Sequence, residues 1–151
     1  MSETFPAAKL LIKVINDFAD FIPYIVLVGG WVPYVYAKYK GKNVPNLAVS
    51  TSDIDFGVGS KKFKGKDSVV SYVRKLGYGE RHVSMDRRAP FVPIVKDGSN
   101  NLKAEVEFIA DPQASKEIIE KLIGGEIKIN EIDNFNLLLE SVEKVIINRQ
   151  K

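Results

Sequence analysis

Two short segments alternate acidic and apolar residues, and this pattern constrains the fold more than any other feature of the chain. Residues 53–58 read Asp-Ile-Asp-Phe-Gly-Val, and residues 104–109 read Ala-Glu-Val-Glu-Phe-Ile. Successive side chains of a β-strand point to opposite faces of the sheet, so each segment predicts a strand with one apolar and one acidic face. The chain should therefore form a sheet with one covered apolar face, while its other face gathers up to four carboxylates.

Helix and strand patterns mix along the rest of the chain. The apolar run 24–28 predicts a strand buried on both faces, and Pro33 fits the first turn of a following helix. We expect a fold of the α/β (α+β) class, a small mixed β-sheet with helices packed on one side, forming one domain over residues 1–151. An opening helix should end near Pro23, with further helices over 67–76, 115–123 and 135–148, and strands over 78–85, 91–95, 102–109 and 127–132. Within this domain, the core motifs lie in 24–111 and a mainly helical C-terminal segment follows at 115–149. Loops are expected at 41–51 and 59–66, and a hairpin turn at 96–101.

Composition excludes several classes of site and compartment. The chain has no cysteine, which excludes thiolate zinc fingers, disulfide scaffolds and cysteine nucleophiles, and its single histidine, His82, excludes a multi-histidine metal site. The longest uncharged run, 21–37, contains two prolines and two glycines and is too short and interrupted to predict a membrane span. We therefore expect a soluble, cytoplasmic protein with no membrane partner.

The acidic face needs cations. Asp53 and Asp55 should point together, as should Glu105 and Glu107, and such clustering is costly through repulsion and desolvation unless it is neutralised. Carboxylate oxygens without nearby histidine or cysteine suit Mg²⁺ or Mn²⁺. The sequence therefore predicts a divalent metal site on this face.

Glycines next to these segments predict a phosphate-binding site. Gly29 and Gly30 lie between a predicted strand and a helix N-terminus, where backbone N–H groups can approach an anion. Gly57 and Gly59 continue the acidic face without side chains and should leave room for a bulky ligand. Ser52 either donates to a phosphate oxygen or simply begins the strand.

This order of motifs resembles the polymerase-beta-type nucleotidyltransferase superfamily, most closely its abortive-infection toxin type. The matching residues are 26–31, 52–58 and 104–109, and the resemblance covers roughly 24–111. It implies that Gly29 and Gly30 hold the triphosphate of an NTP and that Asp53 and Asp55 bind two Mg²⁺ ions. A third carboxylate would ligate one metal and help to deprotonate the attacking hydroxyl. Glu107 matches that position best, with Glu105 as its competitor.

The resemblance implies transfer of a nucleoside monophosphate from an NTP to a hydroxyl, with loss of pyrophosphate. The acceptor would be RNA, such as a tRNA end, a protein side chain or a small molecule, and the toxin-like relatives favour RNA or protein. The enzyme would act as a toxin alongside a partner protein. The alternative is a catalytically degenerate module that binds a nucleotide or a partner. Lysines between 61 and 66, extended by Arg81, Arg87 and Arg88, form either a nucleic-acid contact or a solvated loop, which we favour.

Overall fold

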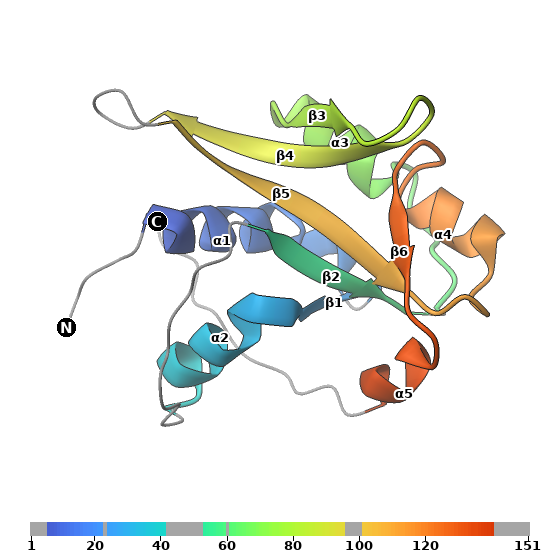
Figure 1. The fold of residues 1–151 in the computed structure, drawn as a ribbon, viewed down its shortest axis with the longest axis horizontal. Helices are drawn as coiled ribbons and strands as arrows, with labels where there is room; N and C mark the ends of the chain where they lie inside the picture. The colour runs from blue at the N-terminus through green and yellow to red at the C-terminus, as the bar shows by residue number, and fades with distance from the viewer. Residues whose placement is uncertain (1–5, 23, 42–52, 60, 96–100, 141–151) are drawn as a thin grey trace.

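The structure is a computed structural model that describes residues 6–22, 24–41, 53–59, 61–95 and 101–140. Its centre is a six-stranded mixed sheet in which β5 pairs with β2, β4 and β6 (Figure 1). The main path runs β1-β2-β5-β4-β3, with β2 and β6 parallel to β5 and the other pairs antiparallel. The strands are β1 (Ile25–Val28), β2 (Ile54–Val58), β3 (Gly79–His82), β4 (Arg88–Val95), β5 (Asn101–Ala110) and β6 (Ile129–Glu131). The predicted mixed α+β class is confirmed.

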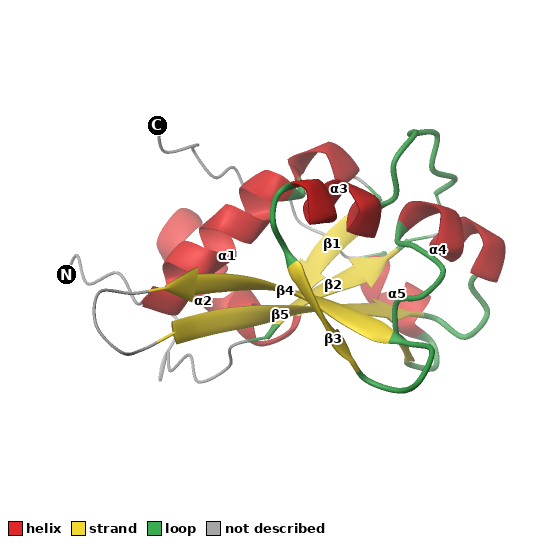
Figure 2. Ribbon diagram, turned by 90° about the horizontal axis from the view of Figure 1, so that it is seen from above, coloured by secondary structure: helices red, strands yellow, loops and turns green. Residues whose placement is uncertain are grey.

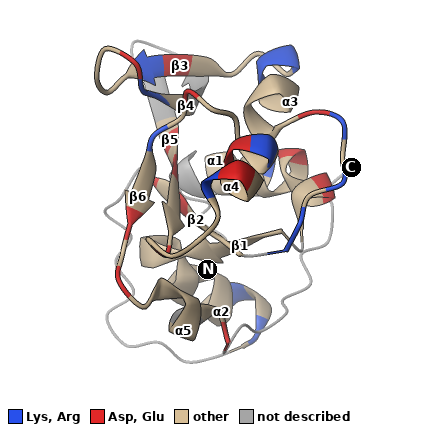
Figure 3. Ribbon diagram, turned by 90° about the vertical axis from the view of Figure 1, so that its right-hand side faces the viewer, with Lys and Arg blue, Asp and Glu red and all other residues tan. Residues whose placement is uncertain are grey.

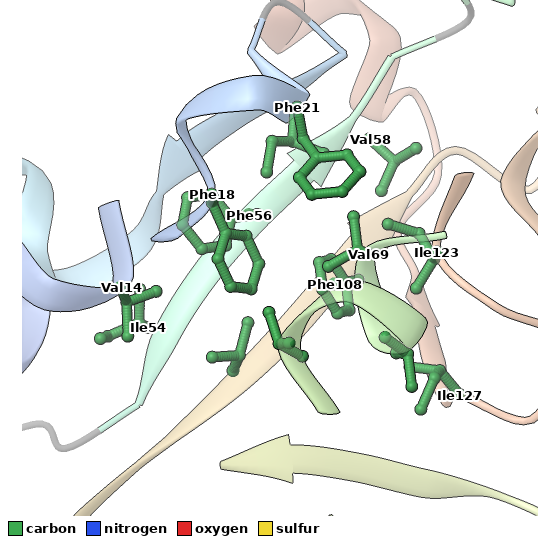
Figure 4. Packing of buried hydrophobic residues seen from close by; sticks show 14 of the residues in the cluster. Val14, Phe18, Phe21, Ile54, Phe56, Val58, Val69, Phe108, Ile123 and Ile127 are labelled. Atoms are coloured by element: carbon green, nitrogen blue, oxygen red, sulfur yellow. The ribbon is translucent and has the colours of Figure 1, made fainter. Parts of the chain in front are cut away.

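Helices cover the apolar face of this sheet. Figure 2 shows α1 and α3 on the same side of the strands. The hydrophobic core lies between these helices and the apolar side chains of β2 and β5. Within it, Phe18, which directly follows α1, stacks on Phe56 with ring centroids 5.1 Å apart and lies 6.4 Å from Phe108 (Figure 4). The helical elements are α1 (Pro6–Asp17), η1 (Ala19–Phe21), η2 (Gly29–Trp31), α2 (Val32–Tyr39), α3 (Val69–Lys75), α4 (Lys116–Leu122) and α5 (Phe135–Leu139).

Local signals set the ends of several helices. Ser68 and Ser115 are N-caps whose hydroxyl oxygens accept the N–H of Ser71 at 3.2 Å and of Ile118 at 3.3 Å. A cap of this kind contributes about 1 kcal/mol. Gly77 follows α3 with φ +93°, a left-handed conformation in which glycine carries no steric cost. The predicted helices at 67–76 and 115–123 are thus confirmed to within two residues of each end.

Some predicted elements differ from the structure. The opening helix ends at Asp17 instead of near Pro23, because Phe18 leaves the helical conformation (φ −96°, ψ 7°), and a short 3₁₀ turn follows. Both Phe18 and Phe21 reach the core as a result. Most of the run 24–28 forms β1 (Ile25–Val28), but among the described strands β1 lies at the edge of the sheet and pairs with β2 alone. Within β1, only Ile25 is fully buried. The prediction of burial on both faces was therefore wrong.

The C-terminal part of the chain contributes to the sheet as well as to the helices. Within 115–149, β6 pairs with β5, in agreement with the strand expected near 127–132. Of the helix expected over 135–148, α5 (Phe135–Leu139) is described, and residues 141–151 lie outside the described part. Most of the loop expected at 41–51 and of the hairpin turn at 96–101 also lies outside it. Antiparallel pairing of Val95 with Asn101 places the ends of β4 and β5 together, as a hairpin requires.

Candidate functional site

Strand register brings the predicted acidic residues together. In the parallel pair of β2 and β5, Asp55 lies opposite Glu107 and Ile54 opposite Val106, so Asp53 comes beside Glu105. One carboxylate oxygen from each of Asp53, Glu105 and Glu107 lies within 4.8 Å of the other two. All of these acidic residues are half-buried. We call Asp53, Asp55, Glu105 and Glu107 the acidic cluster.

The glycine turn after β1 lies against this cluster. Val28 is the cross-strand partner of Asp55, and Gly29 follows it with φ +82°. A Cβ atom on Gly29 would lie 2.3 Å from Oδ2 of Asp55, far inside van der Waals contact. Position 29 therefore requires glycine both for its backbone conformation and for the space that the Asp55 carboxylate occupies. Gly29 and Gly30 are exposed and lead directly into η2 and α2.

Burial and mutual repulsion disfavour the charged forms of two cluster members. Burial, and then the charges of Glu105 and Asp55, raise the pKa of Asp53, while Arg81 opposes the rise. Burial, the charge of Asp53 and a hydrogen bond with Asp55 raise the pKa of Glu107.

Arg81 is part of this site. From β3 it reaches across β4 to Glu105 on β5, where its Nε donates to Oε1 and its Nη2 donates to Oε2 at 3.2 Å. The sequence suggested Arg81 only as an extension of the lysine loop. No local pattern could have shown its ion pair, because the two residues are 24 positions apart and meet only through the strand order.

The donor set fits a hard divalent cation. The ligands on offer are all carboxylate oxygens, which Mg²⁺ and Mn²⁺ prefer. One oxygen from each of Asp53, Glu105 and Glu107 lies within 4.8 Å of the other two, so carboxylates of this cluster are close enough together to be offered to one hard cation. With its charge neutralised in this way, the cluster can face an anionic ligand.

The remaining predicted ligand-facing positions have different environments. Gly57 does not leave room for a ligand: a Cβ there would lie 2.7 Å from Cζ of Phe135, because α5 packs over this part of the acidic face. The expectation of helices on one side only is corrected by the same contact. Gly59 has more space, because a Cβ atom there would lie 3.7 Å from its nearest neighbour, the carbonyl oxygen of Tyr24. Ser52 lies outside the described residues.

The lysine loop, residues 61–66 between β2 and α3, is anchored to the core by an aromatic side chain (Figure 3 shows its blue segments). Phe63 is buried and lies 5.2 Å from the ring of Tyr24 and 5.9 Å from that of Phe21. The four lysines of the loop are exposed. Arg88 pairs with Glu126 at 3.4 Å, so its charge is engaged in the local packing of β4. Exposed lysines fit both a solvated loop and a nucleic-acid contact, so the choice between them stays a prediction.

Trp31 and Tyr34, which follow the glycine turn, are buried and pack edge to face with centroids 5.4 Å apart. Both belong to the hydrophobic core. Over the described ranges, no helix has the length and apolar character needed to cross a bilayer. Comparisons with protein families, with curated proteins and with solved structures gave no match to this chain.

Proposed function

We propose that this protein is a metal-dependent nucleotidyltransferase that moves a nucleoside monophosphate from an NTP to a hydroxyl acceptor. One observation carries the proposal: Asp55 and Glu107 are cross-strand partners, and the Asp55 carboxylate lies against the Gly29 turn. A metal-binding group and a phosphate-binding turn in direct contact are what chemistry on a nucleoside triphosphate needs.

Each residue has a role in this proposal. Asp53, Asp55 and Glu107 hold Mg²⁺ or Mn²⁺, as two ions, and backbone N–H groups of Gly29 and Gly30 bind the phosphates. The bound metal supplies positive charge to the attacking and leaving oxygens. The acceptor oxygen forms a bond to the α-phosphorus, the bond from that phosphorus to the bridging oxygen breaks, and pyrophosphate leaves. A cluster carboxylate accepts the proton of the hydroxyl.

The acceptor follows from the resemblance to toxin-type nucleotidyltransferases. On that basis we propose RNA, such as a tRNA end, or a protein as acceptor, a toxin role, and a partner protein that controls it. An NTP-consuming enzyme without cysteine fits the cytoplasm, where thiols stay reduced and disulfides are rare.

The test is transfer of label from each α-labelled NTP, with Mg²⁺ or Mn²⁺, to total cellular RNA or to a protein extract. We expect label in one fraction, release of pyrophosphate, and loss of both in Asp53→Asn and Asp55→Asn. Glu120→Gln, which removes an exposed carboxylate from α4, is the matched control and should keep full activity. Full activity in both aspartate variants would refute the site.

A second candidate function has one observation in its favour. The Arg81–Glu105 ion pair neutralises part of the acidic cluster without a metal, as a degenerate, noncatalytic binding module would require. Such a module would bind a nucleotide or a partner, show no pyrophosphate release, and be insensitive to Asp55→Asn.

A further inference from the structure

Arg81 reaches the acidic cluster from two strands away. It lies on β3 opposite Ala89 of β4, whose side chain is only a methyl group, and its guanidinium spans β4 to reach Glu105. Both oxygens of Glu105 are engaged by this fork. The two side chains differ in exposure: that of Glu105 is 16% exposed and that of Arg81 is 48% exposed. The Glu105 carboxylate is thus the more buried partner of the pair, and the Arg81 guanidinium is the solvent-exposed one.

The exposed guanidinium of Arg81 has more N–H donors than the ion pair with Glu105 uses. A guanidinium carries five N–H groups in a rigid planar fork, and the pair with Glu105 uses two of them. The same fork geometry matches phosphate oxygens, which it binds through charge-assisted hydrogen bonds. Arg81 also interacts electrostatically with Asp53 and Glu107, so its charge lies at the edge of the acidic cluster.

An anionic substrate makes such a cation useful. An NTP carries several negative charges, and it must approach a sheet face on which four carboxylates lie close together. Arg81 places a fixed positive charge at this face, and the ion pair with Glu105 holds the flexible side chain in one orientation before the ligand arrives. Preorganisation of this kind lowers the entropy cost of binding.

We propose that Arg81 binds the phosphates of the NTP and that Glu105 is its positioning residue rather than a metal ligand. The proposal rests on the proposed function. It leaves the third metal-binding position to Glu107, which faces Asp55 directly across the parallel pair. Glu105, with both oxygens held by Arg81, orients the fork and takes no metal.

The structure contains a matched control pair. Arg74 on α3 forms the same kind of fork with Glu80 on β3, with hydrogen bonds of 2.6 and 2.8 Å. Its exposure is almost identical, 44% for the arginine and 16% for the carboxylate. Glu80 precedes Arg81 on the strand and so faces the other side of the sheet (Figure 3 shows adjacent acidic and basic segments on β3). Arg74→Gln therefore removes an equivalent ion pair away from the acidic cluster.

The experiment measures two affinities of the full chain by calorimetry. The first is for Mn²⁺ alone, and the second is for the α,β-methylene analogues of the four NTPs in the presence of Mn²⁺. For the analogue that the wild type binds, Arg81→Gln should weaken affinity about 10- to 100-fold, the loss typical of a charge-assisted fork. Arg81→Lys should fall between wild type and Arg81→Gln, because it keeps the charge but not the fork. Arg74→Gln should match the wild type.

Metal binding separates the roles of the two glutamates. Glu105→Gln should weaken analogue binding about 3- to 10-fold, through loss of Arg81 orientation, and leave Mn²⁺ affinity within about twofold of wild type. Glu107→Gln should lose Mn²⁺ affinity. In a transfer assay, Arg81→Gln and Glu105→Gln should raise KM for the NTP more than they lower kcat, which a change in overall stability would not do.

The outcomes separate this inference from the proposed function. Analogue affinity of Arg81→Gln within twofold of wild type, or loss of Mn²⁺ affinity in Glu105→Gln equal to that in Glu107→Gln, overturns the inference alone. Arg81-dependent binding without any pyrophosphate release overturns the catalytic function and supports the inference as a property of a binding site. A wild-type chain that binds neither Mn²⁺ nor any analogue overturns both.

Discussion

Removing one carboxylate from the acidic cluster should make the metal-free protein more stable. Glu107→Gln keeps the size of the side chain and its capacity to hydrogen bond with Asp55, but it removes a charge within 4.8 Å of both Asp53 and Glu105. Two unit charges at that distance repel by about 0.9 kcal/mol at the dielectric constant of water and about 3.5 kcal/mol at an effective constant of about 20.

The lower figure applies to these side chains, because they are only half-buried and salt screens them. Two relieved repulsions, less the lost attraction to Arg81, give a net gain of about 1 kcal/mol. For a domain of this size that corresponds to a rise in Tm of about 2–4 °C. The assay is thermal unfolding at pH 7 in low salt with a chelator, with Glu120→Gln as the control.

The sign of the pH dependence follows from the raised pKa of Glu107. The folded protein holds this proton more tightly than the unfolded chain, so wild-type stability falls as the pH rises from the unfolded value of 4.5 through the raised folded value. The advantage of Glu107→Gln should thus be complete above that folded pKa and vanish below pH 4.5. It should also shrink at about 1 M salt, where the screening length is about 3 Å.

Millimolar Mg²⁺ or Mn²⁺ should make the wild type more stable than Glu107→Gln, the reverse of the order expected in chelator. The ion stabilises the wild type by binding the folded state, and the variant loses most of this gain. A variant that is less stable than wild type in chelator, or one that gains as much from the metal as wild type does, would refute the reasoning.

Three further predictions concern packing. Gly29→Ala should cost about 2–4 kcal/mol and weaken Mn²⁺ binding, since strain adds to a clash with a cluster carboxylate; Gly41→Ala, with φ +64° and open space around it, should show the strain of about 1–2 kcal/mol alone. Gly57→Ala should lose about 1–3 kcal/mol, and Phe135→Leu should recover part of it in a double-mutant cycle, additive losses being the contrary result. Tyr78→Phe should lose about 1 kcal/mol in urea unfolding, because the phenol donates a 2.9 Å hydrogen bond to a carboxylate; unchanged stability would contradict that role.

Most of the fold could be predicted from local patterns. The alternation at 53–58 and 104–109 identified β2 and β5, their apolar faces and their acidic faces, because strand geometry ties the face of a side chain to its position. Serine caps and the glycine after α3 fixed helix ends for equally local reasons. Where the prediction failed, at the end of α1 and at the edge strand β1, the cause was packing with distant residues.

By itself, then, the sequence determined which residues share a face: Asp53 with Asp55, and Glu105 with Glu107. It could not determine which strands are neighbours. Tertiary structure decided that β2 and β5 lie side by side in a register that pairs Asp55 with Glu107 and brings the Gly29 turn against Asp55. It also decided that Arg81 reaches Glu105 and that Phe135 covers Gly57. These contacts join residues far apart in the chain, and they exist only because burying the shared apolar face fixes the strand order.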